Sequence, residues 1–321
     1  MKTVCVYHSK DLDGWMSAGI VKHWWELNTK MQEGGIRSDT IDFIGYNYGQ
    51  PIPDLSEYDK VIMCDISFPK EVMSNLMLFH KNNFIWIDHH VSAIRDNNDV
   101  DLKSNGIRDT NYAACELTWK YFMSNPVDKF GEVEDQNPMP EIVRLLGRYD
   151  CFGHKGTPEE LKVLEFQYGA RQCISNYEEA YTELLYSLQN YPIKSEIPIH
   201  ENGKAIYRYL CTDAKQSYKN GFEIRLFTYT EEDHMNPHKF ICINKERFNP
   251  INFGIDYHQD GYDGAACFHR TKDGRWAFSL YNDNGKVDCS QIAKQFGGGG
   301  HKGAAGFIID DINKIIKNGS I

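Results

Sequence analysis

Residues 3–14 read Thr3-Val4-Cys5-Val6-Tyr7-His8-Ser9-Lys10-Asp11-Leu12-Asp13-Gly14, an apolar run followed at once by polar side chains. The run Thr3–Tyr7 is rich in β-branched residues and too short for a helix, so it predicts a buried strand. From Gly14 to Met31, apolar residues recur at helical spacing, which predicts a helix. The stretch therefore indicates a strand–helix unit whose connection carries the polar side chains.

The same alternation continues along the first half of the chain. Three further short apolar runs predict strands at Ile41–Tyr46, Lys60–Cys64 and Phe84–Ile87. Pro69–Lys81 predicts a helix, with the proline suited to its first turn. This order predicts an α/β fold whose N-terminal parallel sheet has helices on both faces.

The character of the chain changes after this sheet. Residues 111–190 are mostly helical in pattern, and Thr157-Pro158-Glu159-Glu160 predicts a capping box at a helix start. His200–Lys219 predicts a connecting helix. After it, strands are expected at Glu223–Tyr229, Lys239–Asn244, Gly264–Arg270 and Trp276–Tyr281. A hairpin turn joins the last two strands, and a helix is expected at Asp288–Phe296. The pattern divides the chain into a domain at 1–195, a connecting helix at 196–220 and a smaller α/β domain at 221–321.

Composition narrows the class of protein. The 321 residues carry 35 Lys plus Arg against 45 Asp plus Glu, a net charge of −10, which disfavours binding to long duplex nucleic acid. No apolar run approaches the roughly 20 residues of a membrane span, and the start of the chain lacks a signal-peptide core. The nine cysteines have neither zinc-site nor disulfide-framework spacing. A cytoplasmic protein without membrane contact is expected.

Acidic and histidine side chains follow three predicted strands. His8, Asp11 and Asp13 follow the first strand, Asp65 follows Lys60–Cys64, and Asp88-His89-His90 follows Phe84–Ile87. Ligands bind beyond the carboxyl ends of the strands in open α/β sheets, so these side chains should converge. Clustered carboxylates repel one another unless a cation neutralises them. Carboxylate oxygens with imidazole nitrogens and no thiolate favour Mn²⁺ or Mg²⁺ over structural zinc.

An ordered set of motifs then resembles a known family. The motifs are His8-Ser9-Lys10-Asp11-Leu12-Asp13-Gly14, Asp65, Asp88-His89-His90, Asp150 in Arg148-Tyr149-Asp150, and Gly298-Gly299-Gly300-His301. In this order they resemble the DHH phosphoesterase superfamily, specifically two-domain members with the DHH-associated C-terminal domain. The resemblance covers nearly the whole chain. It implies a catalytic metal-binding domain at 1–195 and a substrate-binding domain at 221–321, with the active site in the cleft between them.

The resemblance also implies residue roles. Two metal ions, usually Mn²⁺, would be held by His8, Asp11 and Asp65 and by Asp13, Asp65, His89 and Asp150, with Asp65 bridging. Asp88 would orient an imidazole, and His90 would lie beside the phosphate as a donor or leaving-group acid. From the residues alone, Asp150 reads as the polar end of the helical stretch Pro140–Gly147.

The substrate side is expected in the second domain. Glycines 298, 299 and 300 would let a phosphate or base approach the backbone closely, and by resemblance His301 contacts the phosphate of a nucleotide. Arg270 is a candidate cationic neighbour. A glycine run is otherwise read as a flexible turn.

Several functions fit these patterns. The leading hypothesis is a manganese-dependent phosphodiesterase that hydrolyses short single-stranded oligonucleotides or dinucleotides to mononucleotides. The alternatives are hydrolysis of a cyclic dinucleotide or of 3′-phosphoadenosine 5′-phosphate, a polyphosphatase, and an inactive nucleotide sensor. The Gly-Gly-Gly-His motif disfavours the polyphosphatase, since inorganic chains need no nucleoside contact. A complete set of candidate ligands disfavours the sensor.

Overall fold

A computed structural model describes residues 1–30, 39–101, 104–124, 137–189, 196–229, 235–246 and 248–316. Contacts within the chain divide it into two units, Met1–Ile206 and Tyr207–Ile321. The division falls inside the helix α9 (Glu196–Lys219), in the segment where the sequence places the connecting helix.

The first unit is built on a four-stranded parallel sheet. Its strands are β1 (Lys2–His8), β2 (Thr40–Tyr46), β3 (Lys60–Cys64) and β4 (Phe84–Ile87), arranged in the order β2-β1-β3-β4. Tyr7 pairs with Cys64, and Cys64 pairs with Ile87. This register brings the residues that follow β1, β3 and β4 to one edge of the sheet.

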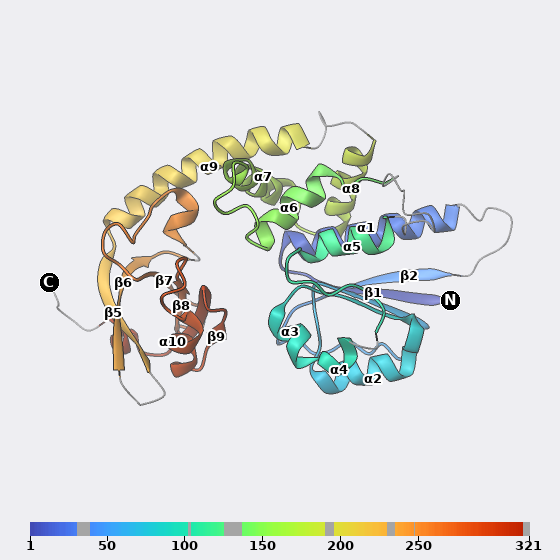
Figure 1. Ribbon diagram of the computed structural model, residues 1–321, viewed down its shortest axis with the longest axis horizontal. Helices are drawn as coiled ribbons and strands as arrows, with labels where there is room; N and C mark the ends of the chain where they lie inside the picture. The colour runs from blue at the N-terminus through green and yellow to red at the C-terminus, as the bar shows by residue number, and fades with distance from the viewer. Residues whose placement is uncertain are drawn as a thin grey trace. The chain divides into compact units, whose positions relative to one another are not determined.

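Side chains alternate between the two faces of this sheet, as the pleat requires. Val4 and Val6 of β1 pack beneath α2 (Lys70–His80), α3 (Val91–Asp96) and α4 (Asn98–Asp101). Cys5 and Tyr7 pack beneath α1 (Leu12–Lys30) and α5 (Ala114–Phe122). Helices therefore cover both faces, which confirms the predicted fold class (Figure 1).

A helical layer continues from α1 and α5. It contains α6 (Glu141–Asp150), α7 (Glu160–Cys173) and α8 (Tyr177–Leu188), which share a core that includes Met16, Trp119 and Phe166. The predicted capping box before α7 is wrong. The Thr157 hydroxyl donates to the carbonyl oxygen of His154 at 2.7 Å, so it serves the preceding turn, and α7 begins only at Glu160 without a side-chain cap.

The second unit is built on a six-stranded mixed sheet in the order β5-β6-β7-β8-β10-β9. Its strands are β5 (Phe222–Tyr229), β6 (Met235–Asn244), β7 (Gly264–Arg270), β8 (Trp276–Tyr281), β9 (Gly299–Gly300) and β10 (Ala304–Ile309). The helix α10 (Cys289–Gln295) covers one face of this sheet. Short 3₁₀ turns lie at Lys81–Asn83, Pro250–Phe253 and Ile312–Lys314.

The last two strands were not expected from the sequence. β10 buries Ala305, Phe307 and Ile309 at alternate positions, a strand pattern that the neighbouring glycines obscure. Among the helices in the described ranges, none combines the length and apolar character needed to cross a bilayer.

Candidate metal centre

Six side chains predicted as metal ligands meet at the carboxyl edge of the first sheet. Their nitrogen and oxygen atoms form two compact groups, one of His8, Asp11 and Asp65 and one of Asp13, His89 and Asp150. A third group joins Asp65 to His89 and His90, so Asp65 belongs to two of the three groups. Within each group the candidate ligand atoms lie within 4.8 Å of one another.

Asp65 occupies the middle of this arrangement. Its carboxylate oxygens lie 3.4 Å from His8 Nδ1 and 3.3 Å from His89 Nε2, and its side chain is only 2% exposed. Directly after β3 the backbone enters the left-handed region at φ 62°, and the Asp65 N–H donates to the carbonyl oxygen of Ile87 at 2.9 Å. Aspartate and asparagine tolerate this conformation better than other non-glycine residues.

The first group depends on a close approach between β1 and α1. A Cβ at Gly14 would lie 2.0 Å from the carbonyl oxygen of His8, so only glycine lets the helix begin this near the strand. Asp11 precedes the helix and accepts the Gly14 N–H at 3.0 Å, while its other oxygen lies 2.9 Å from His8 Nδ1. His8 Nε2 donates to Asn47 Oδ1 at 3.2 Å, so Nδ1 is the nitrogen that could bind a cation once the ring has lost its second proton.

The second group is assembled from three separate elements. His89 Nε2 lies 3.6 Å from Asp13 and 3.2 Å from Asp150, the last residue of α6. Asp13 also accepts the first two N–H groups of α5, from Ala114 at 2.9 Å and from Cys115 at 2.7 Å. The helix terminus therefore holds the Asp13 carboxylate in place.

Asp88 and His90 form a pair beside the two groups. The buried Asp88 carboxylate accepts the backbone N–H groups of His89 and His90 and the indole N–H of Trp86. The same carboxylate lies 2.8 Å from His90 Nδ1, so the imidazole that it orients is that of His90. Burial alone would lower the pKa of His90, but the hydrogen bond with Asp88 and the charge of Asp65 raise it to about 8. Without a bound cation the ring is therefore mostly protonated at neutral pH, with Nε2 as its remaining donor.

The chemistry of this donor set fits divalent cations. His8 Nδ1, His89 Nε2 and Asp65 Oδ1 are buried and make no hydrogen bond of normal geometry, although all three point into the cluster. Burial, followed by the charge of Asp65, raises the pKa of Asp13 to about 7. Burial, followed by the charge of Asp13, likewise raises the pKa of Asp150 to about 7. A cation would satisfy the unbonded atoms and relieve the repulsion between the carboxylates.

The stabilisation that a divalent cation gives should therefore increase with pH. The folded pKa values of Asp13 and Asp150 lie above the unfolded value of about 4, so cation-free stability falls as the pH rises from about 4 to 7. The carboxylates of Asp11 and Asp65 outweigh burial and raise the pKa of His8 to about 11. Protonated His8 therefore stabilises the fold below about pH 6.5, and this stabilisation is lost as the pH rises through the folded pKa of His8. A bound cation opposes both losses.

Thermal unfolding of the chelator-treated chain at pH 5.5 and 7.5, with and without Mn²⁺, checks this prediction. At 100 times the dissociation constant, Mn²⁺ should raise the melting temperature by about 5–10 °C at pH 7.5. The increase should be less than half as large at pH 5.5, because protons compete for the same oxygens. An equal increase at both pH values would show that the cation binds elsewhere.

The predicted substrate residues lie in the second unit. A Cβ at Gly298 would lie 2.1 Å from the carbonyl oxygen of Gly306, so this glycine is needed for packing against β10. Gly299 faces open space, and Gly300 has φ 140°. The exposed His301 follows directly, and its N–H donates to the carbonyl oxygen of Ala304 at 2.7 Å.

The structure does not bring Arg270 to His301. Arg270 lies over the Trp276 ring at the β7–β8 turn and donates to the carbonyl oxygen of Gly274. Trp276 begins β8, whereas Ala304, next to His301, pairs with Tyr281 at the other end of that strand. The antiparallel register therefore separates the two side chains by about the length of the strand, roughly 17 Å.

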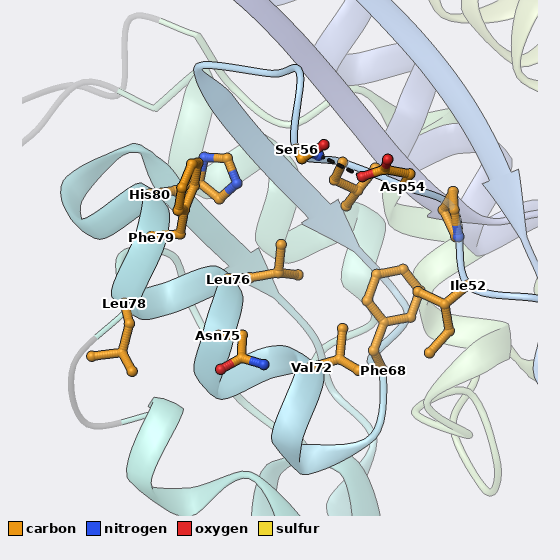
Figure 2. A pocket seen from close by; sticks show the side chains of 12 residues that line it. Ile52, Asp54, Ser56, Phe68, Val72, Asn75, Leu76, Leu78, Phe79 and His80 are labelled. Atoms are coloured by element: carbon orange, nitrogen blue, oxygen red, sulfur yellow. Dashed lines mark hydrogen bonds between the residues drawn. The ribbon is translucent and has the colours of Figure 1, made fainter.

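Two hollows lie outside the metal centre. One, of about 560 Å³, lies between residues 52–56 and α2 and is mostly apolar, with Phe68, Leu76 and Phe79 among its lining (Figure 2). The other, of about 670 Å³, lies in the second unit and includes Gly297, Gly298, His269 and Arg275. Of the predicted site residues, Gly298 lines the second of these two hollows, and Arg275 is a basic side chain of the same hollow that was not predicted from the sequence.

Comparison with known proteins gives a family match within the second unit. Residues 256–318 match the DHHA1 domain family, which confirms the DHH-associated C-terminal domain. The pGpG-specific phosphodiesterase PggH from Vibrio cholerae is 14% identical, with a TM-score of 0.50 over 98% of this chain and 95% of that one. An exopolyphosphatase-related protein from Bacteroides fragilis is 14% identical, with a TM-score of 0.49 over 100% and 88%. Uncharacterized protein R106 of Acanthamoeba polyphaga mimivirus is 24% identical over 96% of this chain and 68% of its own length.

Proposed function

From the match of residues 256–318 to the DHHA1 domain and the resemblance of the N-terminal motifs to the DHH superfamily, we propose that this chain is a divalent-metal-dependent phosphodiesterase of that superfamily. Its substrates are short single-stranded oligonucleotides or linear dinucleotides, and its products are mononucleotides. The observation that carries this proposal is the convergence of carboxylates and imidazoles in which His8 Nδ1, His89 Nε2 and Asp65 Oδ1 are buried without hydrogen bonds of their own. The name of PggH, a phosphodiesterase of similar fold, supports a dinucleotide as the substrate.

The ligand roles follow from the two groups. His8, Asp11 and Asp65 would hold one ion, and Asp13, His89 and Asp150 would hold a second, with Asp65 between them. Bound Mn²⁺ or Mg²⁺ would lower the pKa of a water molecule and neutralise charge on the phosphoryl oxygens. Asp65 would serve both metal ions, because one of its oxygens lies near His8 and the other lies near His89.

The residues around the ligands supply proton transfer and orientation. Hydrolysis adds the oxygen of water to phosphorus and breaks the bond to the leaving oxygen, which then takes a proton. His90 is the proposed donor of that proton, because Asp88 holds its Nδ1 and leaves Nε2 available. In the second unit, Gly298, Gly299, Gly300 and His301 are proposed to contact the nucleotide whose phosphate the metal centre holds.

A substrate panel tests this function. The chelator-treated full chain would be assayed with and without Mn²⁺ on di- to decanucleotides, a cyclic dinucleotide, 3′-phosphoadenosine 5′-phosphate and polyphosphate. We expect Mn²⁺-dependent release of mononucleotides, fastest from the shortest linear substrates, and little hydrolysis of polyphosphate. Turnover undiminished by excess chelator, or hydrolysis of polyphosphate alone, would overturn the proposal. Nucleotide binding without any hydrolysis would indicate a sensor.

A further inference from the structure

The turn after β2, at residues 47–50, is hydrogen-bonded to the candidate metal ligand His8. Gln50 closes the turn by donating its N–H to the carbonyl oxygen of Asn47 at 3.1 Å, and its side-chain oxygen accepts the Asn47 N–H at 2.8 Å. Gly49 supplies the positive φ of 86° that the turn requires. Since Asn47 Oδ1 also accepts from His8 Nε2, the turn and the candidate ligand hold each other in place.

Tyr48 lies at the tip of this turn. Its ring centroid is 6.3 Å from that of His8. Burial, followed by the charge of Asp88, raises the pKa of Tyr48, and the neighbouring Ser67 opposes the rise. Ser67 lies two residues after Asp65 on the far side of β1, because the strand order is β2-β1-β3. The Tyr48 side chain therefore extends from the end of β2 across the carboxyl end of β1 toward Ser67.

Tyr48 is 51% exposed. Scattered exposed aromatic residues are normal on protein surfaces, and they need no explanation by themselves. Tyr48 differs because hydrogen bonds hold its backbone turn and because its ring lies beside the candidate ligand His8, so the exposed ring face stays close to the metal centre. Such a face offers apolar contact at a low cost in side-chain entropy, because a tyrosine has only two χ angles. A side chain that only shielded His8 from water would be buried against it.

We propose that the Tyr48 ring is a stacking platform for the nucleobase next to the phosphate held at the metal centre. This inference rests on the proposed function and extends it by assigning a base subsite to the β2 side of the ligands. Aromatic stacking accepts every base, since each has a flat π face. The subsite therefore selects nucleotides over inorganic phosphate chains without selecting one sequence.

Paired substrates test the platform. One is a linear dinucleotide, and the other is the same molecule with an abasic sugar in place of one base, prepared in both positions. Tyr48→Ala should lower kcat/KM on the intact dinucleotide by about fivefold to a hundredfold. The same variant should match the wild type on one of the two abasic substrates. Tyr48→Phe should stay within about twofold of the wild type, because the ring remains.

A binding readout separates this inference from the proposed function. A dinucleotide containing 2-aminopurine loses fluorescence when that base stacks, whether or not the phosphodiester is cut. Wild type and Tyr48→Phe should quench it, and Tyr48→Ala should not. The matched control is Phe79→Ala, which removes a 71% exposed ring at the far end of α2 and should behave as the wild type. If the wild type hydrolyses neither substrate but quenches through Tyr48, the proposed function fails and the platform stands.

Other outcomes would overturn the platform. Equal losses of Tyr48→Ala on intact and both abasic substrates would mean that the ring supports the ligands rather than a base. A loss in Tyr48→Phe as large as that in Tyr48→Ala would assign the role to the hydroxyl. Unchanged kinetics and quenching in Tyr48→Ala would leave Tyr48 as ordinary surface.

Discussion

Asp65→Asn is expected to lower kcat by about a thousandfold or more, which is the largest loss of any single substitution in the cluster. The proposed function gives this carboxylate to both ions, and several kcal/mol of charge stabilisation depend on such a pair. Asparagine keeps the shape of the side chain and tolerates the left-handed backbone at φ 62°. Alanine would add backbone strain to the loss of the charge, so asparagine gives the cleaner result.

Steady-state hydrolysis of a dinucleotide in saturating Mn²⁺ measures this loss, with melting temperature as the check on folding. Asp54→Asn is a matched control, because Asp54 lies in the same unit and accepts the Ser56 N–H at 3.0 Å outside the cluster. The control should retain wild-type activity. A folded Asp65→Asn chain with near-native turnover would contradict the bridging role.

His301→Ala is expected to lower kcat/KM on a dinucleotide by about tenfold to a hundredfold, the effect of removing a charged hydrogen bond to phosphate. On methyl p-nitrophenyl phosphate, which offers little beyond the phosphodiester, the same variant should be close to wild type. The difference is expected because the ligands lie in the first unit and His301 lies in the second.

Gly299→Val provides a second test of the same idea. A Cβ at Gly299 meets no atom within 4 Å, so a side chain there obstructs an approaching nucleotide while the packing of the glycine run is kept. We expect a loss on the dinucleotide that parallels that of His301→Ala. Equal losses on both substrates would indicate that this segment supports folding. No loss on either substrate would indicate that residues 297–301 form an ordinary turn without contact to the nucleotide.

The sheet and most of the metal centre could be predicted because short buried strands have a strong signal. Once Lys60–Cys64 and Phe84–Ile87 are read as parallel strands, Asp65 and His89 must meet at their carboxyl edge. Asn47 and Tyr48 follow the predicted strand Ile41–Tyr46, so the same rule applied to β2 would have found them. Asp150 ends a helix, and only the family resemblance pointed to it.

Other features depend on contacts that sequence spacing does not carry. The Thr157 oxygen could accept a backbone N–H of the following helix, as a cap does, but its hydroxyl instead donates to the carbonyl oxygen of His154 in the preceding turn. Arg270 is distant from His301 both in the sequence and in the sheet. Arg270 pairs with Trp276 at the start of β8, whereas Ala304, close to His301 in the sequence, pairs with Tyr281 at its end. Gly298 and Gly306 look like a flexible repeat, yet their contact is part of the packing of β10.

The central claim is that the cluster around Asp65 holds a pair of divalent ions. Titration of the metal-free chain with Mn²⁺, followed by electron paramagnetic resonance, tests it most directly, because neighbouring Mn²⁺ ions couple their spins. The account predicts tight uptake of two ions per chain with a coupled spectrum, and loss of the coupling in Asp65→Asn. Absence of tight binding, or a single uncoupled ion that Asp65→Asn leaves unchanged, would contradict it.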